Sequence, residues 1–321
     1  MKKLLALLTA SIMAVSMAAC SAPAEETTTE TGDSPAFKIG VLQLVQHDAL
    51  DQSNAGFFAA LDDAGIKYTA DQQNASGDQV ACQTIAEKLV NDGSDLILAI
   101  ATPAAQAVAG VTSEIPIILT AVTDPAESGL VADNAAPGGN VTGTSDLTPV
   151  KEQIELLTKL LPEAKKVGVL YCSAESNSGI QAKMAHDACV QFGLEAVDYT
   201  VASSNEIQTV VESMVGNVDV IYAPTDNVIA AGMATVGMVA ADNGLAVICG
   251  EGGMVNAGGL ATYGIDYYQL GYLAGQQAID ILVNGASPAT TPIGYLSADK
   301  CELTVNEGVA ATLGIDLSAA K

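Results

Sequence analysis

The stretch Asp95-Leu-Ile-Leu-Ala-Ile-Ala-Thr102-Pro103-Ala-Ala-Gln106 joins an apolar run directly to a sequence that starts a helix. An apolar run this short, bounded by Gly93 and Pro103, is typical of a parallel strand covered on both faces. Thr102 is a favoured N-cap and proline suits the first helical position, so a helix is predicted to follow at once. Such a junction presents backbone N–H groups and a hydroxyl where open α/β sheets bind small ligands.

A second junction of the same kind lies in Asp219-Val-Ile-Tyr-Ala-Pro-Thr225-Asp226-Asn227. The first strand of the chain, Lys38-Ile-Gly-Val-Leu42, is likewise repeated as Lys166-Val-Gly-Val-Leu170. Matched elements recur in the same order and at a nearly constant spacing. The sequence therefore predicts an α/β protein with two similar βαβ lobes, each built on a parallel sheet, joined by a hinge.

The two predicted lobes are discontinuous in sequence. Lobe 1 is expected to comprise residues 37–143 and roughly 267–293 of the chain, and lobe 2 residues 144–266 and roughly 294–321. The first crossing is placed at the Gly-rich segment Pro137-Gly-Gly-Asn-Val-Thr-Gly-Thr144-Ser145, which is turn-prone. Enough chain follows the second repeat to cross back and complete lobe 1, so several crossings are expected to form the hinge.

The N-terminus has the pattern of a lipoprotein signal peptide. Residues 1–19 combine Lys2-Lys3 with an apolar region too short to span a bilayer, and Met17-Ala-Ala-Cys20 resembles a lipobox. Cleavage before Cys20 would leave a lipid-modified thiol that holds the protein on the membrane. Residues 20–36 have the composition of a disordered tether. The alternative is ordinary secretion with an incidental cysteine.

Composition excludes several classes of function. The net charge is −25 and all twelve basic residues are lysine, so the basic surface that a nucleic-acid partner needs is missing. Five cysteines remain besides Cys20, without C-x-x-C spacing, which argues against a disulfide framework or a zinc site. A bridge between Cys172 and Cys189 stays open as an alternative to buried thiols.

Catalytic and cofactor motifs are also missing from the sequence. The first strand is followed by no G-x-G-x-x-G, and neither a P-loop nor a G-x-S-x-G elbow occurs. With only His47 and His186 available, no nucleophile paired with a base can be assembled. We therefore expect a binding protein with no cofactor and no metal rather than an enzyme, with a hydrolase as the less favoured alternative.

Polar residues at predicted strand ends suggest a pocket for a zwitterion. Three acids, Asp226, Glu251 and Asp266, follow strands and as a set could hold an ammonium, although each could also be a cap or a hinge residue. Helix starts near Thr102 and Thr123 could hold a carboxylate without arginine. A sugar site would require more amide side chains, arginine and stacking aromatic rings.

Several motifs together resemble one family. They are the lipobox, Ile39-Gly-Val-Leu-Gln-Leu with His47-Asp-Ala-Leu-Asp51, Ala101-Thr-Pro-Ala-Ala-Gln106, Thr123-Asp-Pro125, Pro137 to Gly143, Val169-Leu-Tyr171 and Pro224-Thr-Asp-Asn227. The chain from about residue 37 to 315 resembles the substrate-binding lipoproteins of ABC transporters of the tryptophan/tyrosine-binding type, which have the type I periplasmic-binding-protein fold.

The resemblance implies an extracytoplasmic receptor, anchored by lipid at Cys20, that closes around an amino acid and delivers it to a permease. It also implies a monomer and no nucleic-acid partner. Receptors for a sugar, a nucleoside or a peptide, and a surface sensor or adhesin, remain alternatives. Because the chain has no tryptophan, stacking on an aromatic ligand would fall to His47 or to a tyrosine such as Tyr263. The contacts that the resemblance implies are Gln46, His47, Thr102, Thr123, Asp124, Ser173, Asn177, Thr225, Asp226, Glu251 and Asp266.

Overall fold

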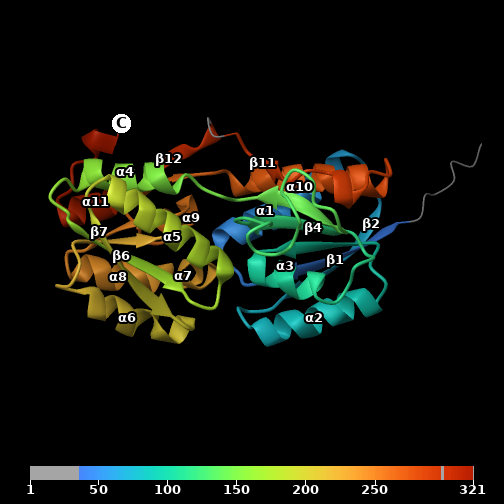
Figure 1. The fold of residues 1–321 in the computed structure, drawn as a ribbon, viewed down its shortest axis with the longest axis horizontal. Helices are drawn as coiled ribbons and strands as arrows, with labels where there is room; N and C mark the ends of the chain where they lie inside the picture. The colour runs from blue at the N-terminus through green and yellow to red at the C-terminus, as the bar shows by residue number, and fades with distance from the viewer. Residues whose placement is uncertain (1–35, 298–299, 321) are drawn as a thin grey trace, which may run out of the picture. The chain divides into compact units, whose positions relative to one another are not determined.

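The computed structural model describes residues 36–297 and 300–320. The predicted signal peptide, Cys20 and all of the predicted tether except Ala36 lie outside these residues. The described chain forms two lobes, each built around a six-stranded sheet (Figure 1).

The first lobe has a fully parallel sheet in the order β11-β5-β4-β3-β1-β2. In Figure 1, α1 and α10 lie on one side of this sheet and α2 and α3 on the other. Its elements are β1 (Phe37–Gln43), α1 (Asp48–Asp63), β2 (Tyr68–Asn74), α2 (Gln79–Asn91), β3 (Leu96–Ile100), α3 (Thr102–Ala109), β4 (Ile117–Val122), β5 (Val141–Ser145), α10 (Tyr267–Leu282), η2 (Pro288–Thr290) and β11 (Gly294–Tyr295).

The second lobe repeats this plan with the sheet order β12-β10-β9-β8-β6-β7, in which only β12 runs antiparallel to its neighbour. Its elements are α4 (Val150–Leu160), β6 (Lys166–Cys172), α5 (Ser176–Gln191), β7 (Glu195–Val201), η1 (Ser204–Glu206), α6 (Ile207–Met214), β8 (Val220–Ala223), α7 (Asn227–Ala231), α8 (Met233–Asp242), β9 (Ala246–Cys249), α9 (Gly252–Asn256), β10 (Ala261–Gly264), β12 (Glu302–Val305), α11 (Glu307–Leu313) and η4 (Leu317–Ala320).

Side chains alternate along a buried strand, so they contribute to a separate hydrophobic core on each face of the sheet. In β6, Val167 and Val169 belong to the core under α4 and α5, whereas Leu170 and Cys172 belong to the core under α6 and α8. Cys189 packs in the first of these cores, on the opposite face of the sheet from Cys172. The alternative of a Cys172–Cys189 bridge is therefore wrong, and both are buried thiols.

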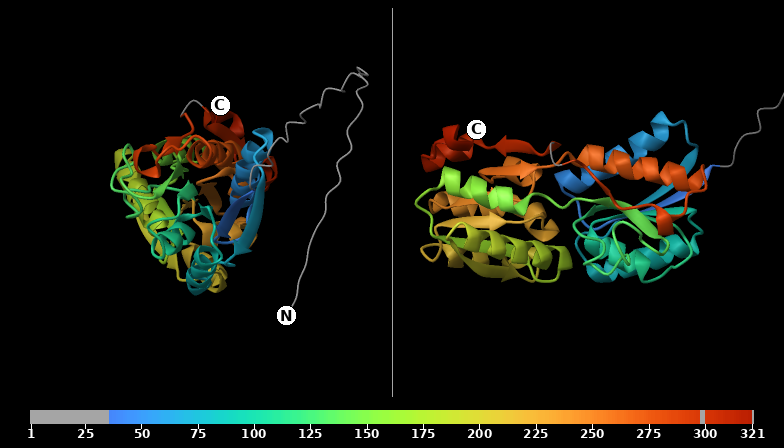
Figure 2. Two further views of the ribbon diagram at one scale, coloured as in Figure 1. Left: turned by 90° about the vertical axis from the view of Figure 1, so that its right-hand side faces the viewer. Right: turned by 45° about the horizontal axis from the view of Figure 1, so that its top comes forward.

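Three segments pass between the lobes. They follow Ser145, Gly264 and Tyr295, the last residues of β5, β10 and β11. Figure 2 shows the lobes side by side with these connections between them. β5 and β11 both lie in the sheet of the first lobe, so the first crossing follows residues 137–145 instead of lying within them, and the third follows Tyr295, close to the predicted boundary at roughly residue 293. The predicted fold class, two parallel-dominated α/β lobes, is confirmed.

The junction after β3 differs in detail from the prediction. Helix α3 begins at Thr102, and Ala101 occupies the N-cap position with a φ of 82° and a ψ of 153°. Thr102 is thus the first helical residue, and its buried hydroxyl finds no hydrogen-bond partner among the described residues. The chain turns one residue earlier than expected because Ala101 adopts a backbone conformation that L-residues rarely use.

Candidate ligand-binding site

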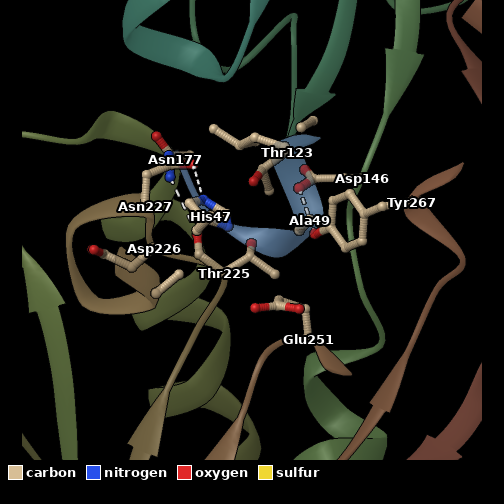
Figure 3. A pocket seen from close by; sticks show the side chains of 13 residues that line it. His47, Ala49, Thr123, Asp146, Asn177, Thr225, Asp226, Asn227, Glu251 and Tyr267 are labelled. Carbon is tan, nitrogen blue, oxygen red and sulfur yellow. Dashed lines mark hydrogen bonds between the residues drawn. The ribbon is translucent and has the colours of Figure 1, made fainter. Parts of the chain in front are cut away.

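A pocket lies between the two lobes at the carboxyl ends of their strands (Figure 3). Both lobes and the first crossing segment contribute to its wall. The lining residues are His47, Ala49, Leu50, Ala121, Thr123, Asp146, Asn177, Thr225, Asp226, Asn227, Ala230, Glu251 and Tyr267. The pocket has a volume of about 290 Å³, which includes space open to solvent.

His47 stands on the first lobe, immediately before α1. Its Nε2 lies 3.2 Å from Asn227 Oδ1 of the second lobe, so the pair bridges the cleft. Its buried Nδ1 finds no partner among the described residues. Burial lowers the pKa of His47, against the opposing effects of Asn227, Asp51 and Asp48. A neutral imidazole ring therefore faces the pocket at neutral pH.

Asp146 follows β5 in the first crossing segment and is the most unusual acid of the site. It is 4 % exposed, and its Oδ2 accepts a hydrogen bond of 2.8 Å from the hydroxyl of Tyr267, the first residue of α10. Its Oδ1 is buried and has no partner among the residues that the structure describes. Burial raises the pKa of Asp146 to about 6, with the Tyr267 and Thr123 hydroxyls acting in the opposite direction. A buried carboxylate oxygen without a donor is costly unless a ligand supplies one.

Asp226 and Glu251, the two acids of the second lobe that reach the pocket, are helix caps. Asp226 Oδ1 accepts from Ile229 N, and its Oδ2 accepts from Cys172 N at 2.6 Å and Ser178 Oγ at 2.7 Å. Glu251 accepts from Gly253 N and from Met254 N, which are the first free N–H groups of α9. Burial raises the pKa of Glu251 to about 7. Both carboxylates already have donors within their own lobe.

Glu175 lies directly behind the pocket wall and is fully buried beside Asp226. Its carboxylate accepts from the Asn227 side chain at 2.5 Å, from Asn177 Nδ2 at 3.2 Å and from Val228 N at 3.1 Å. Burial, and then the charge of Asp226, raise the pKa of Glu175 to about 8. These bonds fix the two asparagine side chains that face the ligand space.

Six of the eleven residues expected in the site line the pocket: His47, Thr123, Asn177, Thr225, Asp226 and Glu251. The other five lie elsewhere. Gln46 lines a separate surface recess beside β2, and Asp124 caps a turn by accepting from Ala126 N and Glu127 N. Ser173 bonds to Val201 O, Asp266 is an exposed cap of α10, and Thr102 is buried beside β3. Tyr263 is also outside the pocket, with its hydroxyl 3.4 Å from Ala320 O.

The sequence interpretation missed Asp146, Tyr267 and Asn227 as pocket residues. Asp146 directly follows β5, just as the acids that were chosen follow their strands, but the residues of β5 were interpreted as part of the first crossing and not as a strand. Tyr267 follows Asp266, and of this neighbouring pair only the tyrosine turns inward. A rule that considers strand-end polar residues within hinge segments would have found both.

No group of three or more His, Cys, Asp or Glu side chains within 36–297 and 300–320 is arranged to hold a metal ion. In the same part of the chain, no helix is long and apolar enough to cross a membrane.

The buried acids predict an unusual dependence of stability on pH. Because the pKa values of Glu251 and Glu175 are raised to about 7 and about 8, the folded protein binds more protons than the unfolded chain up to about pH 8. The free energy of unfolding of the ligand-free protein should therefore fall from pH 6.5 to about 8, by about 1.4 kcal/mol per pH unit for each proton difference, and level off above that pH, where both acids are ionised in the folded protein as well. Below pH 6.5 the lowered pKa of His47 makes stability rise with pH and so opposes the effect of the acids. Denaturant unfolding at several pH values measures this, and constant or rising stability between pH 6.5 and 8 would contradict it.

The chain is similar to known proteins over most of its length. The family model described as ABC transporter substrate binding protein matches residues 38–320. A tyrosine-binding protein of Clostridioides difficile strain R20291 is 43% identical in an alignment of 321 positions, and this alignment covers 97% of this chain and 92% of that protein.

Two solved structures are similar over 88% of this chain and 96% of theirs. One is an ABC domain from Streptococcus pneumoniae in complex with L-Trp, with 39% identity and a TM-score of 0.85. The other is the ligand-free, open structure of a substrate-binding protein with adhesive properties from Clostridium difficile, with 41% identity and a TM-score of 0.66.

Proposed function

The chain belongs to the family of ABC transporter substrate-binding proteins, and we propose that it captures tyrosine or tryptophan by closing its two lobes around the amino acid. Substrate-binding proteins of ABC importers work outside the cytoplasm, which places the site in the extracytoplasmic space. The relatives at about 40% identity include one named for tyrosine binding and one in complex with L-Trp.

The observation that carries the proposal is the unpaired oxygen of Asp146. An α-ammonium group would supply the donor that the buried Oδ1 lacks and the positive charge that a buried carboxylate requires. We assign the ammonium to Asp146 rather than to Asp226, because both oxygens of Asp226 are occupied by donors of its own lobe. Glu251 would add a second negative charge on the opposite wall.

The α-carboxylate would be held by neutral donors, since the chain has no arginine. The hydroxyls of Thr123 and Thr225 and the amide of Asn177 line the same pocket. Hydroxyl and amide groups bind a carboxylate well in a site that excludes water, where each hydrogen bond is electrostatically stronger.

The aromatic side chain would lie among the apolar residues of the wall, which are Ala49, Leu50, Ala121 and Ala230. The neutral ring of His47 and the ring of Tyr267 are the two ring systems that reach this space. We propose His47 and Tyr267 for the ring contacts, because Tyr263 lies outside the pocket. Offset or edge contacts between rings favour an aromatic ligand over an aliphatic one of similar size.

Closure of the lobes is supported by the interlobe contacts and by the two structural comparisons. His47 bonds to Asn227 across the cleft, and on its rim Gln79 Nε2 donates to Ala174 O at 2.9 Å. At nearly equal identity, the TM-score is 0.85 against the L-Trp complex and 0.66 against the open structure. A ligand that contacts both lobes shifts the equilibrium towards the closed form.

The remaining parts of the proposal concern partners. We propose that a lipid on Cys20 holds the protein on the membrane, that it acts as a monomer, and that it delivers its ligand to an ABC permease. We assign it binding and no catalysis. A second, adhesive role is worth testing because one relative of 41% identity is described as having adhesive properties.

Isothermal titration calorimetry with L-tyrosine and L-tryptophan tests the proposal, with L-leucine, arabinose and a nucleoside as comparison ligands. We expect one or both aromatic amino acids to bind at least about tenfold more tightly than leucine, which corresponds to about 1.4 kcal/mol. Binding of the sugar or the nucleoside, with no response to any amino acid, would overturn the assignment of a zwitterion pocket.

A further inference from the structure

Gln181 is a fully buried glutamine in the middle of α5, one helical turn after Asn177. It does not line the pocket, so it has no place in the ligand contacts described above. A buried amide must find hydrogen-bond partners for two N–H groups and one carbonyl oxygen. The positions of those partners show what this side chain does.

All partners of Gln181 are two threonines of the pocket wall. Within the second lobe, Gln181 Oε1 accepts from Thr225 N at 3.4 Å, and Nε2 donates to Thr225 O at 3.3 Å and to the Thr225 hydroxyl. Across the cleft, Nε2 donates to Thr123 Oγ1 of the first lobe at 3.2 Å. The bonds to Thr225 are internal to one lobe, whereas the bond to Thr123 exists only when the lobes meet.

This interlobe bond differs from those at the rim. Gln79 and Gln106 also bridge the lobes, to Ala174 O and to Ser176 Oγ, but both glutamines are exposed. Water can replace an exposed bond at little cost when the lobes separate. The Gln181–Thr123 bond is buried on both sides, where hydrogen bonds are stronger and their geometry is fixed.

The bond also orients the Thr123 hydroxyl. A hydroxyl has one proton to donate, and accepting from Gln181 leaves that proton free to point elsewhere. Thr123 lies close enough to Asp146 to act on its pKa, and both residues line the pocket. That proton is therefore available to an acceptor on the ligand.

We propose that Gln181 is a positioning residue that fastens the two lobes in the closed state and orients Thr123 for the ligand. It links closure to binding without touching the ligand itself. The inference rests on the proposed function for its ligand, but the closing role can be measured without any ligand.

The test is a double-mutant cycle on tyrosine and tryptophan affinity with Gln181→Met, Thr123→Val and the double variant, each of which keeps the side-chain volume roughly constant. We expect Gln181→Met to weaken binding by about 3- to 10-fold, the range for one net hydrogen bond. In the Thr123→Val background, Gln181→Met should weaken binding by a clearly smaller factor than it does in the wild type. Gln106→Met, at the exposed rim, is the matched control and should stay within about twofold of the wild type.

Strictly additive effects, or unchanged affinity in Gln181→Met, would overturn the proposal. If the wild-type protein binds neither amino acid, the proposed function fails, and small-angle scattering of the ligand-free protein still decides about Gln181. Gln181→Met should then show a larger radius of gyration than the wild type and than Gln106→Met. An identical radius in all three proteins, with unchanged thermal unfolding, would rule out the closing role.

Discussion

Replacing Asp146 by asparagine is expected to weaken tyrosine or tryptophan binding by at least about 100-fold, the scale for removing one partner of a buried charge pair. The substitution keeps the shape of the side chain and its acceptor for the Tyr267 hydroxyl, which donates at 2.8 Å. It removes the negative charge beside the proposed ammonium. Titration calorimetry with both amino acids measures the loss.

The same substitution should leave the ligand-free protein at least as stable as the wild type. In the absence of ligand the Asp146 carboxylate is buried and one of its oxygens has no donor, so its charge opposes folding. Neutral asparagine avoids that cost. Loss of binding together with undiminished thermal stability separates a ligand contact from a structural role, because damage to the fold would lower both.

Asp124→Asn is the matched control. Asp124 follows the pocket residue Thr123, but its Oδ1 accepts from Ala126 N and Glu127 N, a role that an asparagine oxygen can also fill. We expect affinity within about threefold of the wild type, since no charged partner is lost. If Glu251→Gln abolished binding while Asp146→Asn did not, the ammonium would belong to Glu251.

The pH dependence of binding follows from the same residue. The pKa of Asp146 is raised to about 6, so the ionised form that holds an ammonium dominates above that value and is lost as the pH falls below it. Affinity should decrease with acidification from pH 7 to 5 in the wild type. A carboxylic acid with the same aromatic side chain and no ammonium should bind weakly and show little of this dependence.

The lobes could be predicted from sequence because their signals are local and repeated. A buried parallel strand such as Leu96–Ile100 is uniformly apolar, and Gly93 and Pro103 mark its limits. The second copy of each element strengthens the assignment of the first. Strand-end residues such as Thr225 and Glu251 could also be assigned to the pocket, because parallel strands all end at the same edge of a sheet.

The remaining residues of the site depend on how the lobes meet, which no local pattern encodes. Gln181 has the sequence context of an ordinary polar residue in a helix, yet it is buried and bonds to Thr123 of the other lobe. Asp146 lies in a connection, and its hydrogen-bond partner Tyr267 is far away in the chain. Gln46 and His47 are neighbours, yet His47 lines the cleft and Gln46 lines a separate recess.

Substituting Gly271 by alanine is expected to produce the largest loss of stability among single-methyl changes in this protein. Helices α1 and α10 cross so closely that a Cβ on Gly271 would lie 1.9 Å from Ser53 O, and one on Gly56 would lie 2.0 Å from Tyr268 O. These neighbours are backbone atoms that cannot rotate away. We expect a loss of about 3 kcal/mol or more in the free energy of unfolding, at the upper end for overpacking.

Gly179→Ala is the control, because it makes the same chemical change in a helix with open space around it. Gly179 lies in α5 and is exposed, and a Cβ there would meet no atom within 4 Å. Alanine should stabilise the protein by about 0.5–1 kcal/mol through its better helix propensity. Opposite signs for the two substitutions in denaturant unfolding would show that close approach, and not glycine itself, is required at the α1–α10 crossing.

The crossing also connects stability to binding. Helix α1 begins directly after His47, and α10 begins with Tyr267, so both helices present a pocket residue at their N-terminal ends. Forcing the helices apart would move Tyr267 relative to Asp146 and weaken the bond that fixes the carboxylate. Gly271→Ala should therefore weaken ligand binding even under conditions where the protein remains folded. Unchanged affinity in a destabilised but folded variant would show that the pocket tolerates movement of α10, and the assigned role of Tyr267 would then be wrong.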